Sequence, residues 1–136
     1  MPAKDLKNLI TRLYRFSIVG IISTVINYIC FLLLYKTFFF HYILSSTIGY
    51  LIGLLLGYFI NKNWTFVEKI EIKESYIVKY FFAQIIGLVI CQLILLTLVE
   101  MFLLNPLLAN FFALAIATIV CFILIDSYVF RSKENN

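Results

Sequence analysis

The chain has 136 residues, of which 63% are hydrophobic and only 13% are charged. A soluble domain is about half apolar and about a quarter charged, so a core of this size cannot bury so many apolar side chains, and a water-soluble globular protein is excluded. The length predicts one membrane-embedded domain, residues 1–136, with no room for a soluble catalytic domain.

Four runs without Asp, Glu, Lys or Arg follow one another along the chain, at 16–35, 37–61, 80–99 and 101–125. Each has at least 20 residues, and a bilayer core of about 30 Å needs roughly 20 helical residues. None of the runs alternates as the strands of a membrane barrel do. We therefore expect an all-α integral membrane protein with four transmembrane helices, spanning about 16–40, 42–61, 79–103 and 106–129.

The basic residues are distributed very unevenly between the two sides of these spans. Of the 11 Lys and Arg residues, all but Lys36 lie before the first span, in the loop at about 62–79, or after the last span. Positively charged loops stay in the cytoplasm. Both termini and the middle loop are therefore expected to be cytoplasmic.

The chain repeats itself at an offset of 64 residues. Arg15 corresponds to Lys79, and NWTF at 63–66 corresponds to SYVF at 127–130. The two halves, about 12–66 and 76–130, begin on the same side of the membrane. They are therefore predicted to be parallel repeats, two helical hairpins related by an axis along the membrane normal.

Small residues recur every four positions on the second and fourth spans. Such a face lets neighbouring helix backbones approach closely. The residues predicted to pack in this way are Gly49, Gly53, Gly57, Ala113 and Ala117. The offset also pairs Lys62 with Asp126 at matched depth, which suggests an ion pair between the ends of the second and fourth spans.

The polar cluster that ends the second span is the first candidate site. The Lys62 ammonium, at the cytoplasmic headgroup level, can meet a lipid phosphate, while Asn61 and Asn63 can donate to phosphate or sugar oxygens. The alternative is that Lys62 extends to the interface and only marks topology. Arg15 and Lys79 have the same two interpretations, and Trp64 is either an interfacial anchor or a stacking surface for a sugar.

Three amides lie at membrane depth: Asn27, Gln84 and Gln92. Polar groups there must bond within the bundle or line a polar path. Both interpretations remain open from the sequence.

Motifs for other chemistry are missing from the sequence. The three cysteines, Cys30, Cys91 and Cys121, have neither metal-ligand nor CxxC spacing. There is no nucleotide-binding glycine loop, no nucleophile–base set and no basic DNA-reading surface. We therefore expect a protein that is not an enzyme, with no catalytic residue, metal, cofactor or nucleic-acid partner.

Several short motifs resemble those of a known family. They are Arg15-Phe16 with Gly20, Asn27, the ending Phe59-x-Asn61-Lys62-x-Trp64-x-Phe66, Lys79-Tyr80-Phe81, and Tyr128-Val129-Phe130. This set, over nearly the whole chain, resembles the GtrA-like family of small four-span membrane proteins of bacterial surface glycosylation. The chain departs from that family at Ile125 and Asp126, where an Asn and a basic residue are usual, and at Asn27, where an acid is common.

The resemblance implies a bacterial cytoplasmic-membrane protein that flips an undecaprenyl-phosphate-linked monosaccharide outward. A glycosyltransferase would then transfer the sugar to teichoic acid, O-antigen or another surface polymer. The alternative is a non-transporting subunit that recruits or orients a polyprenyl-phosphate glycosyltransferase. The expected partners are membrane lipid, the polyprenyl-phosphate sugar and glycosyltransferases. Four helices enclose little volume, so a homo-oligomer or an open, lipid-facing groove is expected.

Overall fold

The computed structural model of the chain describes residues 3–65 and 74–125. It has four α-helices, α1 (Ala3–Lys36), α2 (Tyr42–Ile60), α3 (Glu74–Leu96) and α4 (Pro106–Ile125), with π-helical turns η1 (Asn61–Thr65) and η2 (Thr97–Met101) after α2 and α3. Four segments are long and apolar enough to cross a membrane, Tyr14–Lys36, Tyr42–Trp64, Ile77–Met101 and Pro106–Leu124. The described part of the chain contains no strand. The predicted all-α, four-span fold is confirmed.

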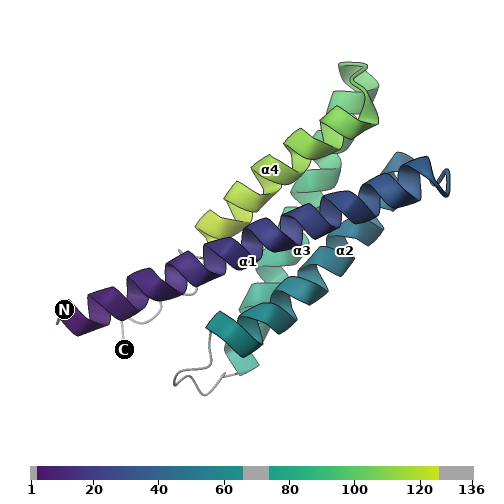
Figure 1. Cartoon of the computed structure of the whole chain (residues 1–136). Coiled ribbons are helices and arrows are strands. Elements are labelled where there is room, and N and C mark those ends of the chain that lie inside the picture. The colour runs from purple at the N-terminus through teal and green to yellow at the C-terminus, as the bar shows by residue number, and fades with distance from the viewer. Residues whose placement is uncertain (1–2, 66–73, 126–136) are drawn as a thin grey trace.

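The helices form two hairpins, α1–α2 and α3–α4, which cross one another (Figure 1). The short loops 37–41 and 102–105 lie at one end of the bundle, here called the loop end. Arg15, Lys62 and Lys79 lie toward the other, here called the basic end. Asp126, the expected partner of Lys62, falls outside the described residues.

The two loops have the same conformation at the same 64-residue offset. Phe39 and Leu103 both have positive φ, of 56° and 53°. In each loop the next residue then donates its backbone N–H to a carbonyl six residues back, Phe40 to Leu34 and Leu104 to Leu98. Helices α1 and α3 end before the expected 40 and 103, since a positive φ at Phe39 and Leu103 is incompatible with a continuing right-handed helix. The prediction extended too far because these apolar loops carry no charge that could mark a turn.

Each loop also ends in a helix cap. The His41 side chain accepts a hydrogen bond from the Ile43 N–H, and the Asn105 side chain accepts one from the Leu107 N–H. Pro106 then opens α4, where its fixed φ suits the first turn. Both spans therefore begin at defined positions although the sequence around them is apolar.

The helices of the first hairpin touch through the glycines of α2. A Cβ atom on Gly49 would lie 2.7 Å from the Asn27 carbonyl oxygen, and one on Gly53 would lie 2.8 Å from the Ser23 carbonyl oxygen. Real Cβ atoms essentially never come this close, so only glycine permits this separation of α1 and α2. Ala113 and Ala117 are the buried counterparts on α4.

Replacing Gly53 with Ala is expected to destabilise the protein by about 1–3 kcal/mol, because the added methyl group overpacks the α1–α2 contact. Gly20→Ala is the matched control, since a Cβ on Gly20 meets nothing within 4 Å. Thermal unfolding of the two variants in detergent tests this. Equal melting temperatures would contradict the proposed close contact.

Candidate functional site

A cavity of about 310 Å³ lies among the four helices in the half of the bundle nearer the basic end. Every helix contributes a polar group to its wall. These groups belong to Ser23 and Asn27 of α1, Tyr50 of α2, Asn61 of η1, Gln84 of α3 and Thr118 of α4. The volume is at the lower end of the range for ligand pockets, about 300–1,000 Å³, so the cavity suits one small headgroup.

The cavity extends from the middle of the membrane to its basic boundary. Asn27 packs against Gly53, which is central in the span Tyr42–Trp64. Asn61 follows Gly53 by eight residues, which corresponds to about 12 Å of helix. A ligand in this cavity could therefore cross close to half of a hydrocarbon core of about 30 Å.

The mouth of the cavity opens sideways, between α1 and α4. Its strongly exposed lining residues, Ile21, Ile119 and Phe122, belong to these two helices. The lining residues of α2, such as Gly53 and Leu54, are buried. Because the outer surface at this depth is apolar, the mouth faces lipid.

Two polar atoms on the cavity wall have no hydrogen-bond partner within the described residues. They are Asn27 Oδ1 and Ser23 Oγ, and both are buried. An unsatisfied polar group inside a bilayer costs several kcal/mol. Asn27 Oδ1 lies 3.1 Å from the Cβ position of Gly49, and Ser23 Oγ lies 2.7 Å from that of Gly57, so both atoms face the contact with α2 rather than the open space of the cavity.

A row of side-chain pairs, here called the polar ladder, joins α2 to α3, and its two pairs nearest the basic end also line the cavity. Each pair links a buried position of α2 or η1 to α3 or η2. The pairs are Asn61–Tyr80, Tyr50–Gln84 at 3.2 Å, Ser46–Gln92 at 3.3 Å and Tyr42–Glu100. The polar ladder connects the two hairpins from the basic end to the loop end.

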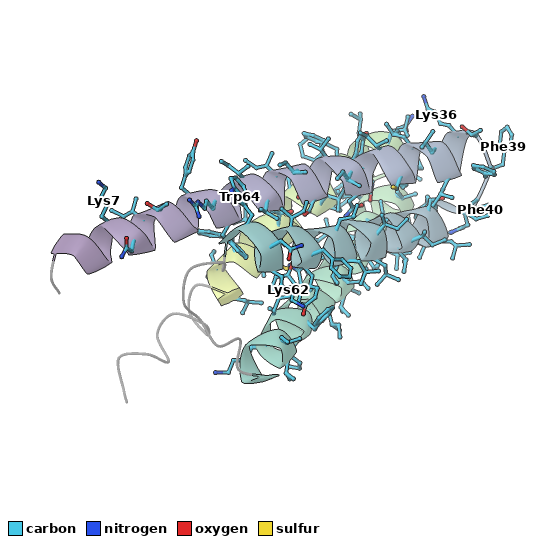
Figure 2. The ribbon with its side chains drawn as sticks, turned by 60° about the horizontal axis from the view of Figure 1, so that its bottom comes forward. Lys7, Lys36, Phe39, Phe40, Lys62 and Trp64 are labelled. Carbon is cyan, nitrogen blue, oxygen red and sulfur yellow. The ribbon has the colours of Figure 1, made fainter. Side chains whose placement is uncertain are left out.

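The charged residues predicted for the site lie around the basic end. Lys62 and Asn63 are exposed on η1, and Lys79 is exposed on α3. Arg15 is half-buried, with its guanidinium 5.9 Å from the centre of the Trp64 ring and its Nη1 donating to the Trp64 carbonyl oxygen at 3.3 Å. Figure 2 shows Trp64 beside α1, with Lys62 extending from a different side of η1.

The three predicted amides do not all belong to one site. Asn27 and Gln84 line the cavity, but Gln92 lies outside it, eight residues beyond Gln84 on α3. Sequence reasoning missed Ser46, Tyr50 and Asn110, which are buried polar groups of the spans. Asn110 interrupts an apolar run, and that interruption was the available signal.

No group of three or more His, Cys, Asp or Glu side chains that could hold a metal occurs within 3–65 and 74–125. The cavity wall offers hydroxyl and amide groups instead. Its chemistry is that of hydrogen bonding to a polar ligand at a lipid boundary.

Comparison with known protein families identifies the family of this four-helix chain. The chain matches the GtrA/DPMS transmembrane domain family over residues 15–135. The chain belongs to this family. No curated protein and no solved structure matches it. Membership associates this multi-pass membrane protein with the handling of polyprenyl-phosphate sugars, in a family that is not typically catalytic.

Replacing Arg15 with Ala is expected to change the environment of Trp64, the only tryptophan of the chain. The guanidinium covers the indole ring and fixes the backbone of η1. We expect increased acrylamide quenching and an altered emission maximum in Arg15→Ala, and a smaller change in Arg15→Lys. Unchanged fluorescence in Arg15→Ala would argue against the contact.

Proposed function

We propose that this protein flips an undecaprenyl-phosphate-linked monosaccharide across the cytoplasmic membrane for glycosylation of a cell-surface polysaccharide such as teichoic acid or O-antigen. The observation that supports this is the cavity, which carries a polar group from every helix on a mostly apolar wall, reaches the middle of the membrane and opens to lipid between α1 and α4. A headgroup can enter this space while its prenyl tail remains in the bilayer. Unaided passage of a charged phosphate through hydrocarbon is very costly.

The phosphate would first meet the cations of the basic end. Lys62 and Lys79 are exposed there and can each donate to a phosphate oxygen. Arg15 uses one N–H on the Trp64 carbonyl, and a guanidinium has five. These three residues are the proposed phosphate contacts, with Asn61 and Asn63 beside them on η1.

The sugar would occupy the cavity itself. Asn27 and Ser23 of α1, with Gln84 across the cavity on α3, are the lining residues proposed to form hydrogen bonds with sugar hydroxyls. The small volume favours one sugar unit over an oligosaccharide. Since the sequence has no ATP-binding loop, movement would be equilibrative and driven by consumption of the sugar outside.

The basic end is proposed to face the cytoplasm, because positively charged flanks are retained there. A C-terminal alkaline phosphatase fusion should be inactive in cells, whereas a fusion inserted at Phe39 should be active. A C-terminal green fluorescent protein controls for expression. An active C-terminal phosphatase fusion would reverse the assigned orientation.

The function is tested by transbilayer movement of a short-chain polyprenyl-phosphoryl hexose in vesicles. Gly20→Leu should abolish movement without destabilising the protein, because Gly20 lines the cavity and no atom lies within 4 Å of its Cβ position. Gly20→Ala should retain most of the activity. If Gly20→Leu moves the lipid as fast as wild type, the cavity is not the route.

Removing a cation of the basic end should also slow movement. Lys62→Ala is expected to lower the rate about threefold to tenfold, since an exposed charge-assisted contact is weakened by solvent. Lys36→Ala is the matched control, an equally exposed lysine at the loop end. Equal rates in both variants would mean that Lys62 does not contact the phosphate and only helps to set the membrane topology.

The alternative, a non-transporting subunit that recruits a glycosyltransferase, makes the opposite prediction. Folded wild-type protein would then move no lipid above empty vesicles. Gly20→Leu and Lys62→Ala would also support normal glycosylation in cells, because neither the cavity nor the cation would be used.

A further inference from the structure

Outside the cavity, three side chains from three helices form a hydrogen-bonded cluster, here called the amide cluster. Gln92 Nε2 of α3 donates to Ser46 Oγ of α2 at 3.3 Å, and Ser46 Oγ donates to Asn110 Oδ1 of α4 at 2.8 Å. Ser46 and Asn110 have no exposed surface. These two residues are 64 positions apart, so they are the same position of the two repeats.

The amide cluster retains one unused acceptor and one unused donor. Gln92 Oε1 and Asn110 Nδ2 are buried and have no hydrogen-bond partner in the described part of the chain. Side chains that served only to join helices would be expected to use these atoms, because each unsatisfied group is costly inside a bilayer. A hydroxyl both donates and accepts, so it is the ligand group whose chemistry matches both kinds of atom.

The ligand that fits this cluster is neutral. Its three members are an alcohol and two amides, and none carries a charge that would attract a phosphate. Its position is on the continuation of the cavity toward the loop end. Tyr50 lines the cavity, and Ser46 precedes Tyr50 by four residues, or about 6 Å along α2.

We propose that Ser46, Gln92 and Asn110 form a second sugar-binding subsite, in the loop-side half of the path. It takes up a hydroxyl of the monosaccharide after the sugar leaves the cavity near Asn27. The subsite is closed in this structure, since Ser46 and Asn110 are fully buried, and its use requires α2 and α4 to separate. This inference rests on the proposed function.

The experiment measures initial rates of transbilayer movement for a short-chain polyprenyl-phosphoryl hexose and for its mono-deoxy analogues. Wild type is expected to move one analogue about threefold to tenfold more slowly than the parent, the effect of one neutral hydrogen bond. Gln92→Leu and Asn110→Leu should move the parent as slowly as that analogue, so the preference disappears. Ser45→Ala, which removes an equally buried hydroxyl of α2 outside the cluster, should retain it.

The outcomes distinguish a failure of the proposed subsite from a failure of the proposed function. If the variants slow the parent and all analogues by the same factor, or if Ser45→Ala loses the preference equally, the cluster only joins helices and the subsite is wrong. If wild type moves the hexose without preferring any hydroxyl, flipping stands and the subsite is overturned. No movement by wild type above empty vesicles overturns the proposed function and the subsite with it. Should the leucine variants fail to fold, Ser46→Ala against Ser45→Ala decides, because Ser46 orients both amides.

Discussion

The backbone contact between α1 and α2 is the constraint on which the rest of the bundle depends. Gly49 and Gly53 allow the carbonyl oxygens of Asn27 and Ser23 to lie where any other residue would place its Cβ. This contact fixes α1 against α2, and it fixes the Asn27 side chain at the middle of the membrane. Because α1 packs closely along α2, the direction of its axis is fixed, and it does not pack as closely along α4. The lateral opening between α1 and α4 is a consequence of that choice.

The position of the opening follows from how the two repeats differ. The 64-residue offset makes α4 the counterpart of α2, and α3 the counterpart of α1. The α2–α3 interface therefore corresponds to the α4–α1 interface. In the first, Gln84 reaches across to Tyr50; at the equivalent positions of the second stand Gly20 and Leu114, which cannot form that bond. The α4–α1 interface keeps other polar contacts, Thr24 with Thr118 and Tyr28 with the Leu107 carbonyl, but without a counterpart of the Tyr50–Gln84 pair it leaves space for the cavity beside Gly20. The two repeats thus contribute different side chains to the cavity.

The sequence predicted the parts of this structure that depend on local properties. The charge-free runs gave the four spans, and the four-residue spacing of small residues indicated the face of α2 that packs. The ends of α1 and α3 were missed because residues 37–40 are as apolar as the spans themselves. The separation of Gln92 from Asn27 could not be predicted, since it depends on how the hairpins cross. Ser46 was overlooked within the polar stretch Ser45-Ser46-Thr47, and Asn110 because it stands singly in an apolar run, and only their contact across the repeat reveals them.

The distribution of charge is suited to transit rather than to tight binding. The cations Arg15, Lys62 and Lys79 lie at the basic end, while the described groups along the path offer only neutral hydroxyls and amides. A cation at mid-membrane would stabilise the phosphate strongly and slow its release. Neutral hydrogen bonds contribute only about 0.5–1.5 kcal/mol each, so a headgroup can exchange them one after another. Conduction through any pore requires sites that are favourable enough to enter and weak enough to leave, and the proposed neutral path from Asn27 to Asn110 would meet that requirement for a sugar whose phosphate stays near the lipid.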